Sequence, residues 1–174
     1  MRVLSIDPAL RNTGYAVIER RLKTGRTPTY KVVTYGVIEN GRKLRQSGCL
    51  LAIHEQLRDV IQNHKPEVCA VEGVIYVQSF KTAITMGAAR GAAILSAAEF
   101  GLEVFEYAPK RVKQAVVGKG AADKQQVAFM IRALLGLTET PPHDAADALA
   151  IGLAHFYEQD PTRVSRLADK PAAI

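Results

Sequence analysis

Four carboxylates in this sequence stand at positions where they could bind metal ions. Asp7 follows the apolar run 3–6, and Glu72 follows the apolar run 68–71. In α/β sheets, ligands bind at the carboxyl ends of the strands, which is where both of these acids would lie. If the two strands are parallel neighbours, their two terminal carboxylates lie side by side.

Asp144 and Asp147 are three residues apart in the segment HDAADALAIGLAH. On a helix, residues at this spacing share a face, so both can point toward the first two acids. Four clustered carboxylates repel one another and need cations, and a set of oxygen ligands suits Mg²⁺ or Mn²⁺ rather than zinc. Two such ions about 4 Å apart can hydrolyse a phosphodiester, because one supplies hydroxide and the other stabilises the leaving oxygen.

Each acid taken singly has a structural explanation. An Asp in the first helical turn is favoured by the helix dipole, and an Asp before Pro8 is typical of a turn. His143 fits either an additional ligand or proton-transfer group, or a polar residue at a helix start. The joint pattern of the four acids favours a catalytic site.

The pattern of expected strands and helices around these acids predicts a mixed sheet in an α/β fold. Three β-rich segments suggest an antiparallel meander, and the later strands alternate with helices, so helices should cover both faces of five strands. The predicted strands are 3–6, 14–19, 31–38, 68–71 and 104–105, and the predicted helices are 43–64, 79–100, 109–117, 122–135 and 143–157.

The 174 residues suit one domain, predicted over residues 1–157 and followed by a flexible polar tail, 158–174. No apolar run reaches the length of a membrane span, and the N-terminus does not resemble a signal peptide. Cys49 and Cys69 stand in apolar surroundings, which predicts buried free thiols and a reducing, cytoplasmic compartment. His155 fits an ordinary position at a helix surface or end.

The net charge of +6 is concentrated in two segments. Residues 109–132 carry six cations against one acid, and residues 20–31 carry five cations and no acid. Such a surface suits a phosphate backbone and predicts salt-sensitive binding. The acids expected nearby favour a phosphate contact for the first segment, whereas a solvated basic face explains the second equally well.

In addition, the sequence resembles the bacterial Holliday-junction resolvases, the RuvC family, which have a ribonuclease H-like fold. The segments that carry the resemblance are IDP with TGYAVIE, VEGVIYVQS, ARGAAIL, VFEYAPKRVKQAVVGKGAADKQQV and HDAADALAIGLAH. RVKQAVVGKG and DAADALA are the most specific of them.

The resemblance implies roles for individual residues. The four acids match the family's catalytic residues, which bind Mg²⁺, with two ions per site and Mn²⁺ as a substitute. The implied phosphate or DNA contacts are Lys113 and Lys124, with Lys110, Arg111 and Lys119 as further candidates. Ile75 or Tyr76 falls where the family wedges a side chain into the junction. Tyr76 and Phe80 could stack on bases, although Phe80 fits a core aromatic better.

The resemblance also implies partners. The family acts as a symmetric homodimer that nicks two opposing strands of a four-way DNA junction, in recombination and repair, and works with a branch-migration motor complex. Small residues crowd the segment 86–98, where the family forms its dimer interface. The same residues would also suit packing on the chain's own sheet.

Two departures from the family pattern stand beside the acids. Ser5 and Ala9 replace the usual glycines around Asp7, which predicts slightly different local geometry. Gly73 stands where the family often has a larger polar residue, which predicts a change in the flexibility or DNA preference of the following loop.

Three alternative functions remain compatible with the residues. One is a nuclease of the same fold that cuts RNA–DNA hybrids or DNA ends. Another is a module that binds junctions without cutting them. The last is an actin-like ATPase, for which the chain is short and lacks phosphate-binding loops.

Overall fold

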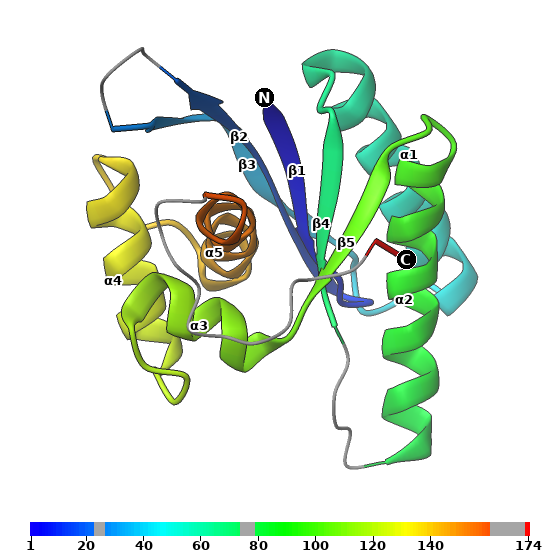
Figure 1. The fold of residues 1–174 in the computed structure, drawn as a ribbon. Helices are drawn as coiled ribbons and strands as arrows, with labels where there is room; N and C mark the ends of the chain where they lie inside the picture. The colour runs from blue at the N-terminus through cyan, green and yellow to red at the C-terminus, as the bar shows by residue number, and fades with distance from the viewer. Residues whose placement is uncertain (23–26, 74–78, 161–172) are drawn as a thin grey trace.

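Five strands form one mixed sheet in the order β3-β2-β1-β4-β5 (Figure 1). The computed structural model describes residues 1–22, 27–73, 79–160 and 173–174. The strands are β1 (Arg2–Asp7), β2 (Asn12–Arg21), β3 (Thr29–Glu39), β4 (Val68–Glu72) and β5 (Glu103–Tyr107). The first three form the predicted antiparallel meander, and β4 and β5 run parallel to β1, which confirms the predicted sheet.

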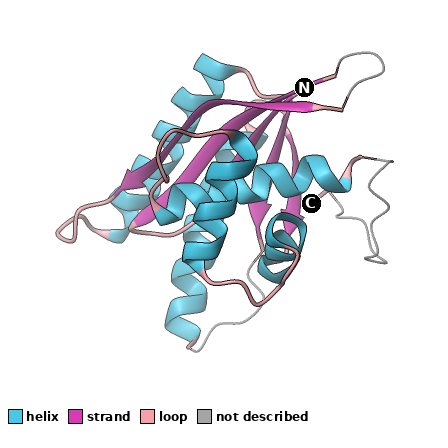
Figure 2. Cartoon of the chain, turned by 90° about the vertical axis from the view of Figure 1, so that its left-hand side faces the viewer, coloured by secondary structure: helices cyan, strands magenta, loops and turns pink. Residues whose placement is uncertain are grey.

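Helices cover both faces of this sheet. Within the described residues the helices are α1 (Gln46–His64), α2 (Phe80–Ala98), α3 (Pro109–Val117), α4 (Lys124–Leu135) and α5 (His143–Glu158). Helices α1 and α2 lie on one face and α5 lies on the other, with α3 and α4 packed around α5 (Figures 1 and 2). None of the described helices is long and apolar enough to cross a membrane.

The alternating side chains of β1 supply two separate cores. Val3 faces the α5 layer, where it shares a core with Leu149, Leu153 and Phe156. Leu4 faces the opposite layer and belongs to a core that includes residues of α1 and α2. This period of two is what a central strand between two helical layers requires. Cys49 and Cys69 are buried free thiols, as predicted.

Two glycines allow α5 to lie directly against the sheet. A Cβ on Gly14 would stand 1.9 Å from the carbonyl oxygen of Asp144, and one on Gly152 would stand 2.7 Å from the Ser5 hydroxyl oxygen. Ser5 is fully buried at this contact, and its hydroxyl lies 3.3 Å from the Ala16 carbonyl oxygen. Gly152 therefore makes room for the serine that replaces a family glycine, and Gly14 holds the start of α5 against β2.

The end of the chain returns to the sheet. Glu158 is the last residue of α5 rather than part of a tail, and its carboxylate pairs with Arg111 at 2.5 Å. Ala173 bridges to Phe105, and the Ile174 amide donates to the Val104 carbonyl at 2.9 Å. Residues 161–172 lie outside the described part of the chain, so the flexibility of that segment stays a prediction.

Candidate metal and phosphate site

Asp7 and Glu72 lie side by side at the carboxyl end of the sheet. Strands β1 and β4 are parallel, with Ile6 opposite Val71, so the next residue of each strand is one of the two acids. Their carboxyl groups share a hydrogen bond. The predicted juxtaposition of these two acids is therefore confirmed.

Burial and like charge raise the pKa of both carboxyl groups. Desolvation is the main cause, and the Asp147 carboxylate adds to it, so the pKa of Asp7 rises to about 6. The pKa of Glu72 rises further, to about 8, because of burial and the neighbouring Asp7 and Asp147 carboxylates. Without a cation, burial and like charge therefore favour retention of one proton by this pair of carboxyl groups near neutral pH.

The first turns of α5 bring the second pair of acids to the same place. Asp144 and Asp147 are partly buried, and both raise the pKa of Asp7 through their charge. The contact of Gly14 with the Asp144 carbonyl fixes this end of the helix beside β2. Four carboxylates, from β1, β4 and α5, therefore share one electrostatic site, as the sequence predicted.

Lys124 is a cation that faces this cluster. Its Nζ lies 3.2 Å from Oδ2 of Asp147. Partial burial lowers the pKa of Lys124, but the carboxylates of Asp147, Asp7 and Asp144 outweigh that effect and raise the pKa above its usual value. Lys124 in turn lowers the pKa of Asp7 and Glu72. The ammonium group is therefore an internal counter-ion of the acidic cluster.

A capping box fixes the backbone from which Lys124 extends. Asp123 is the N-cap of α4, and its side chain accepts from the Gln126 amide at 2.8 Å. The Gln126 side chain accepts in return from the Asp123 amide at 3.1 Å. Because Lys124 is the first residue of the helix, this reciprocal cap holds its Cα in place while the side chain reaches the acids.

The other predicted phosphate contacts lie on and just after α3. Lys110 and Lys119 are exposed, and Lys113 is partly buried. The Gln114 side chain braces the loop that carries Lys119, since it donates to the Gly118 carbonyl at 2.9 Å. Arg111 instead forms an ion pair with Glu158 in which both side chains are largely buried, so its guanidinium joins α3 to α5. We therefore revise the expected phosphate contact of Arg111 to a structural role.

The donor set fits a hard divalent cation. All four side chains offer carboxylate oxygens, which hard cations prefer. Burial is the main reason that the pKa values of Asp7 and Glu72 are raised, and repulsion from neighbouring carboxylates adds to it, so a bound cation would relieve that repulsion. Among the described residues, however, no three His, Cys, Asp or Glu side chains already surround one ion position. The interaction between Asp7 and Glu72 and the Lys124 contact with Asp147 stabilise the acids in this arrangement.

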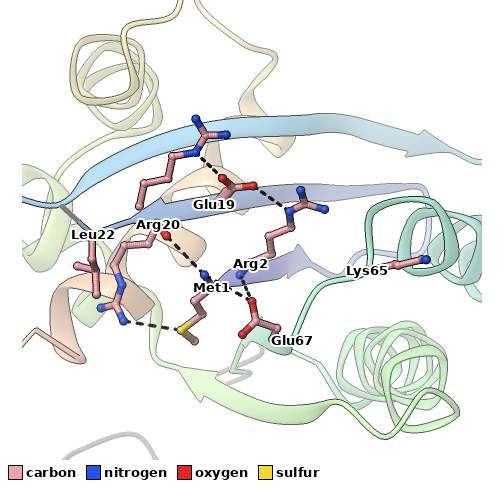
Figure 3. Close-up of a pocket in the computed structure, with 8 residues that line it drawn as sticks. Met1, Arg2, Glu19, Arg20, Leu22, Lys65 and Glu67 are labelled. Atoms are coloured by element: carbon pink, nitrogen blue, oxygen red, sulfur yellow. Dashed lines mark hydrogen bonds and ion pairs between the residues drawn. The ribbon is translucent and has the colours of Figure 1, made fainter.

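A charged hollow lies at the opposite end of β1 from the four acids (Figure 3). There the Glu19 carboxylate accepts from Arg2 Nε at 2.9 Å and also pairs with Arg21. These hydrogen bonds lower the pKa of Glu19 to about 2. Arg20 lies over the Phe156 ring, 5.3 Å from its centroid. These contacts give Arg20 and Arg21 structural roles, away from the four acids.

Several predicted site residues lie outside the acidic cluster. Phe80 is 90% exposed at the start of α2, so the expectation of a core aromatic is wrong. It begins a helix that extends past the end of the sheet (Figure 1). His143 is exposed at the first residue of α5, and its role stays a prediction. Ile75 and Tyr76, the candidate wedge residues, lie outside the described part of the chain.

The backbone after Glu72 is held by β5. The Gly73 amide donates to the Tyr107 carbonyl at 2.9 Å. A Cβ on Gly73 would stand 2.7 Å from Oε1 of Glu106, which pairs with Arg90 of α2. Glycine therefore leaves room for an ion pair that connects α2 to β5, which gives this departure from the family pattern a structural reason.

A buried polar pair behind the site was missed by sequence reasoning. The Tyr107 hydroxyl lies 2.8 Å from Nδ1 of His155, and both residues are fully buried. His155 lies in the last turn of α5, near a helix end as one alternative predicted, but it is buried, so the alternative of a helix surface is wrong. Burial and the nearby Arg20 lower the pKa of His155 to about 4, so it is neutral at pH 7. The signal was the apolar residues around it, which bury α5 on nearly every side.

The fold and the site together define a class of protein. A mixed five-stranded sheet with helices on both faces, and acids at the ends of β1 and β4 and on the last long helix, is the ribonuclease H-like arrangement of a metal-dependent nuclease. A family model described as "Crossover junction endodeoxyribonuclease RuvC" matches residues 3–155. The chain belongs to this family.

Individual relatives agree with that assignment. The chain is 54% identical over 170 residues to "Crossover junction endodeoxyribonuclease RuvC" of Akkermansia muciniphila, covering 98% of this chain and 99% of that protein. The relative from Caldicellulosiruptor saccharolyticus is 44% identical over 157 residues, or 90% of this chain and 92% of its own. The structure of Thermus thermophilus RuvC in complex with a Holliday junction substrate superposes with a TM-score of 0.83 at 33% identity, covering 99% of both chains.

Proposed function

We propose that this protein is a metal-dependent endonuclease that resolves four-way DNA junctions by paired nicks in opposing strands. The observation that carries the proposal is the cluster of Asp7, Glu72, Asp144 and Asp147 with Lys124 against it, on a chain of the RuvC family. The superposition on a relative whose structure contains a Holliday junction supports the substrate.

The four carboxylates would hold two Mg²⁺ ions, and Mn²⁺ would substitute because it also prefers oxygen ligands. Bound there, the ions would supply a nucleophile at neutral pH and stabilise the departing oxygen. Asp7 and Glu72 would release their shared proton to solvent on ion binding, and their burial would then strengthen the attraction of both carboxylates for the cation. Lys124, with Lys113 on the neighbouring α3, would neutralise charge on the scissile phosphate.

We also propose that two copies of the chain form a homodimer through α2. One face of that helix is exposed to solvent although its side chains are apolar or small. The residues of this face are Phe80, Ile84, Gly87, Gly91, Leu95 and Ala98. A Cβ on Gly87 or on Gly91 would meet nothing within 4 Å, so the helix backbone is open to close approach. A two-fold axis would present two sites to a junction that has matching symmetry.

The remaining expectations follow from the family rather than from this geometry. The loop that contains Ile75 and Tyr76 would enter the junction centre. A branch-migration motor complex would act with the dimer, and a cytoplasmic location would give both access to the chromosome.

The substrate proposal is tested with three labelled DNA substrates of similar length and Mg²⁺. We expect paired nicks in a four-way junction, and at least about a hundredfold slower cutting of a linear duplex or an RNA–DNA hybrid. Faster cutting of the hybrid or of duplex ends would replace junction resolution with another nuclease activity. Junction binding without any metal-dependent nick would indicate a binding module.

A further inference from the structure

We propose that Lys124 competes with the divalent ion for Asp147, and that ion binding releases the Lys124 ammonium to the DNA phosphate, so that metal and junction bind cooperatively. This inference rests on the proposed function, because it concerns the same acidic site. Lys124 would then have two successive partners, first the Asp147 carboxylate and then a DNA phosphate. A lysine that only bound phosphate would need one partner.

The first step is the contact itself. Lys124 Nζ stands 3.2 Å from Asp147 Oδ2, within the distance of a charge-assisted hydrogen bond. It also interacts with the charges of Asp7 and Asp144. One monovalent cation therefore partly compensates carboxylates that come from β1 and α5. A divalent ion bound to Asp147 would meet this ammonium as a like charge at short range, so the two cations exclude each other.

The second step is that the lysine can leave without disturbing the fold. Its side chain is 60% exposed, whereas that of Asp147 is 20% exposed, so the lysine reaches the acids from the solvent side. Its backbone is held by the capping box of Asp123 and Gln126 at the start of α4. Rotation about the side-chain bonds is therefore enough to move the ammonium from the carboxylate to a neighbouring anion.

The third step is where the released charge goes. Once an ion neutralises the acids, Lys124 loses its partner at Asp147 and remains at the mouth of the site. A DNA phosphate placed there for hydrolysis would be the next available anion. Binding of the phosphate would hold Lys124 away from Asp147, and this would strengthen ion binding by the same factor by which the ion strengthens DNA binding.

The test measures Ca²⁺ binding by calorimetry, with and without a junction that carries uncleavable phosphorothioate linkages at the cut sites. For the wild-type protein we expect the junction to tighten Ca²⁺ binding at least about fivefold. For Lys124→Met we expect Ca²⁺ binding without DNA to be several-fold tighter than in the wild type. We expect the effect of the junction to be smaller than in the wild type, because only the direct attraction between Ca²⁺ and the phosphate remains. Cleavage in Mg²⁺ should fall at the same time.

Lys113→Met is the matched control, because it removes an equal charge from the neighbouring α3. It should leave Ca²⁺ affinity without DNA unchanged within about twofold. Lys124→Gln provides a second variant, and a thermal melt confirms that each variant is folded. Equal or weaker Ca²⁺ binding in both Lys124 variants would overturn the inference and leave the proposed function standing. If the Asp144→Asn variant bound Ca²⁺ as tightly as the wild type does, that result would instead contradict the metal site itself.

Discussion

The acids of this site create charge repulsion that the folded chain must relieve. Without a divalent ion, the relief comes from a proton shared by Asp7 and Glu72 and from the ammonium of Lys124. In the proposed mechanism, a bound ion would replace both the shared proton and the Lys124 ammonium. At the scale of single residues, metal binding, proton release and lysine release would then be parts of one exchange.

This exchange predicts a pH dependence of stability for the metal-free protein. Glu72 has its pKa raised to about 8 in the folded chain, so the folded state binds more protons than the unfolded state in this range, and stability falls as pH rises from 6.5 to 8.5. We expect a loss of about 1–2 kcal/mol, or a Tm lower by roughly 3 °C. His155 opposes this trend only slightly. It is neutral in the folded chain throughout this range because its pKa is lowered to about 4, and only the unfolded chain takes up its proton, near the ordinary pKa of 6.5.

The measurement is a set of thermal melts in a chelator between these pH values, repeated with Glu72→Gln. The variant keeps a hydrogen-bonding side chain but has no proton to lose, so its Tm should stay nearly level. A wild-type Tm that rises with pH over this range would contradict the shared proton.

Gly14 gives a steric prediction at the same scale. A Cβ added there would overlap the Asp144 carbonyl at 1.9 Å, so Gly14→Ala must displace the start of α5 and its two acids. We expect about tenfold or more slower junction cleavage and a lower Tm. Gly41→Ala is the control, since a Cβ there meets nothing within 4 Å. Equal cleavage by both variants would show that the close approach does not matter.

At the scale of elements, the order of strands and helices was predictable because the hydrophobic periods are clear. The parallel pairing of β1 with β4 follows from the connection through α1, and it alone places Asp7 beside Glu72. Lys124 and Asp147 are far apart in the sequence, so no local signal indicated their ion pair, which depends on how α4 packs against α5. The exposed Phe80 was missed because apolar character alone does not show where a helix extends past its sheet.

The N-terminus of α4 gives a testable prediction at the scale of elements. The helix begins at Lys124 rather than at residue 122, because Asp123 caps it. Asp123→Ala removes the cap and should cost about 1 kcal/mol in the free energy of unfolding. It should also slow cleavage, because the first residue of the helix carries the ammonium of the site.

Chemical denaturation and a junction cleavage assay measure the two effects. Asp123→Asn is the control, since asparagine caps helices about as well as aspartate. If Asp123→Ala lost stability and kept full activity, the capping box would not position Lys124.

At the scale of the whole molecule, one acidic site per chain must serve two strands of a symmetric substrate. The exposed apolar face of α2 supports a dimer, which would supply a second site. The sequence indicated the small residues of that face, but it did not indicate that they are exposed. Packing on the chain's own sheet accounts for Ala89, Ala93 and Ala97, which are buried. The small residues of this helix thus divide between two opposite faces.

Leu95→Glu tests the dimer. Leu95 is 54% exposed, so glutamate should leave the fold intact while placing a charge in the proposed interface. We expect the mass in solution to halve and paired nicks to become single nicks. Leu51→Glu on α1 is the matched control, at 55% exposure, and should remain a dimer. A Leu95→Glu protein that is still dimeric would place the interface elsewhere.

The most direct test of the account compares wild-type protein with Asp144→Asn on one mobile four-way junction labelled on all four strands. With Mg²⁺, the wild type should produce symmetric nicks in two opposing strands. Asp144→Asn should bind the junction with unchanged affinity and cut it about a thousandfold or more slowly, because a neutral amide cannot replace the carboxylate. Cleavage by Asp144→Asn at the wild-type rate would contradict the assignment of the four acids as the catalytic centre.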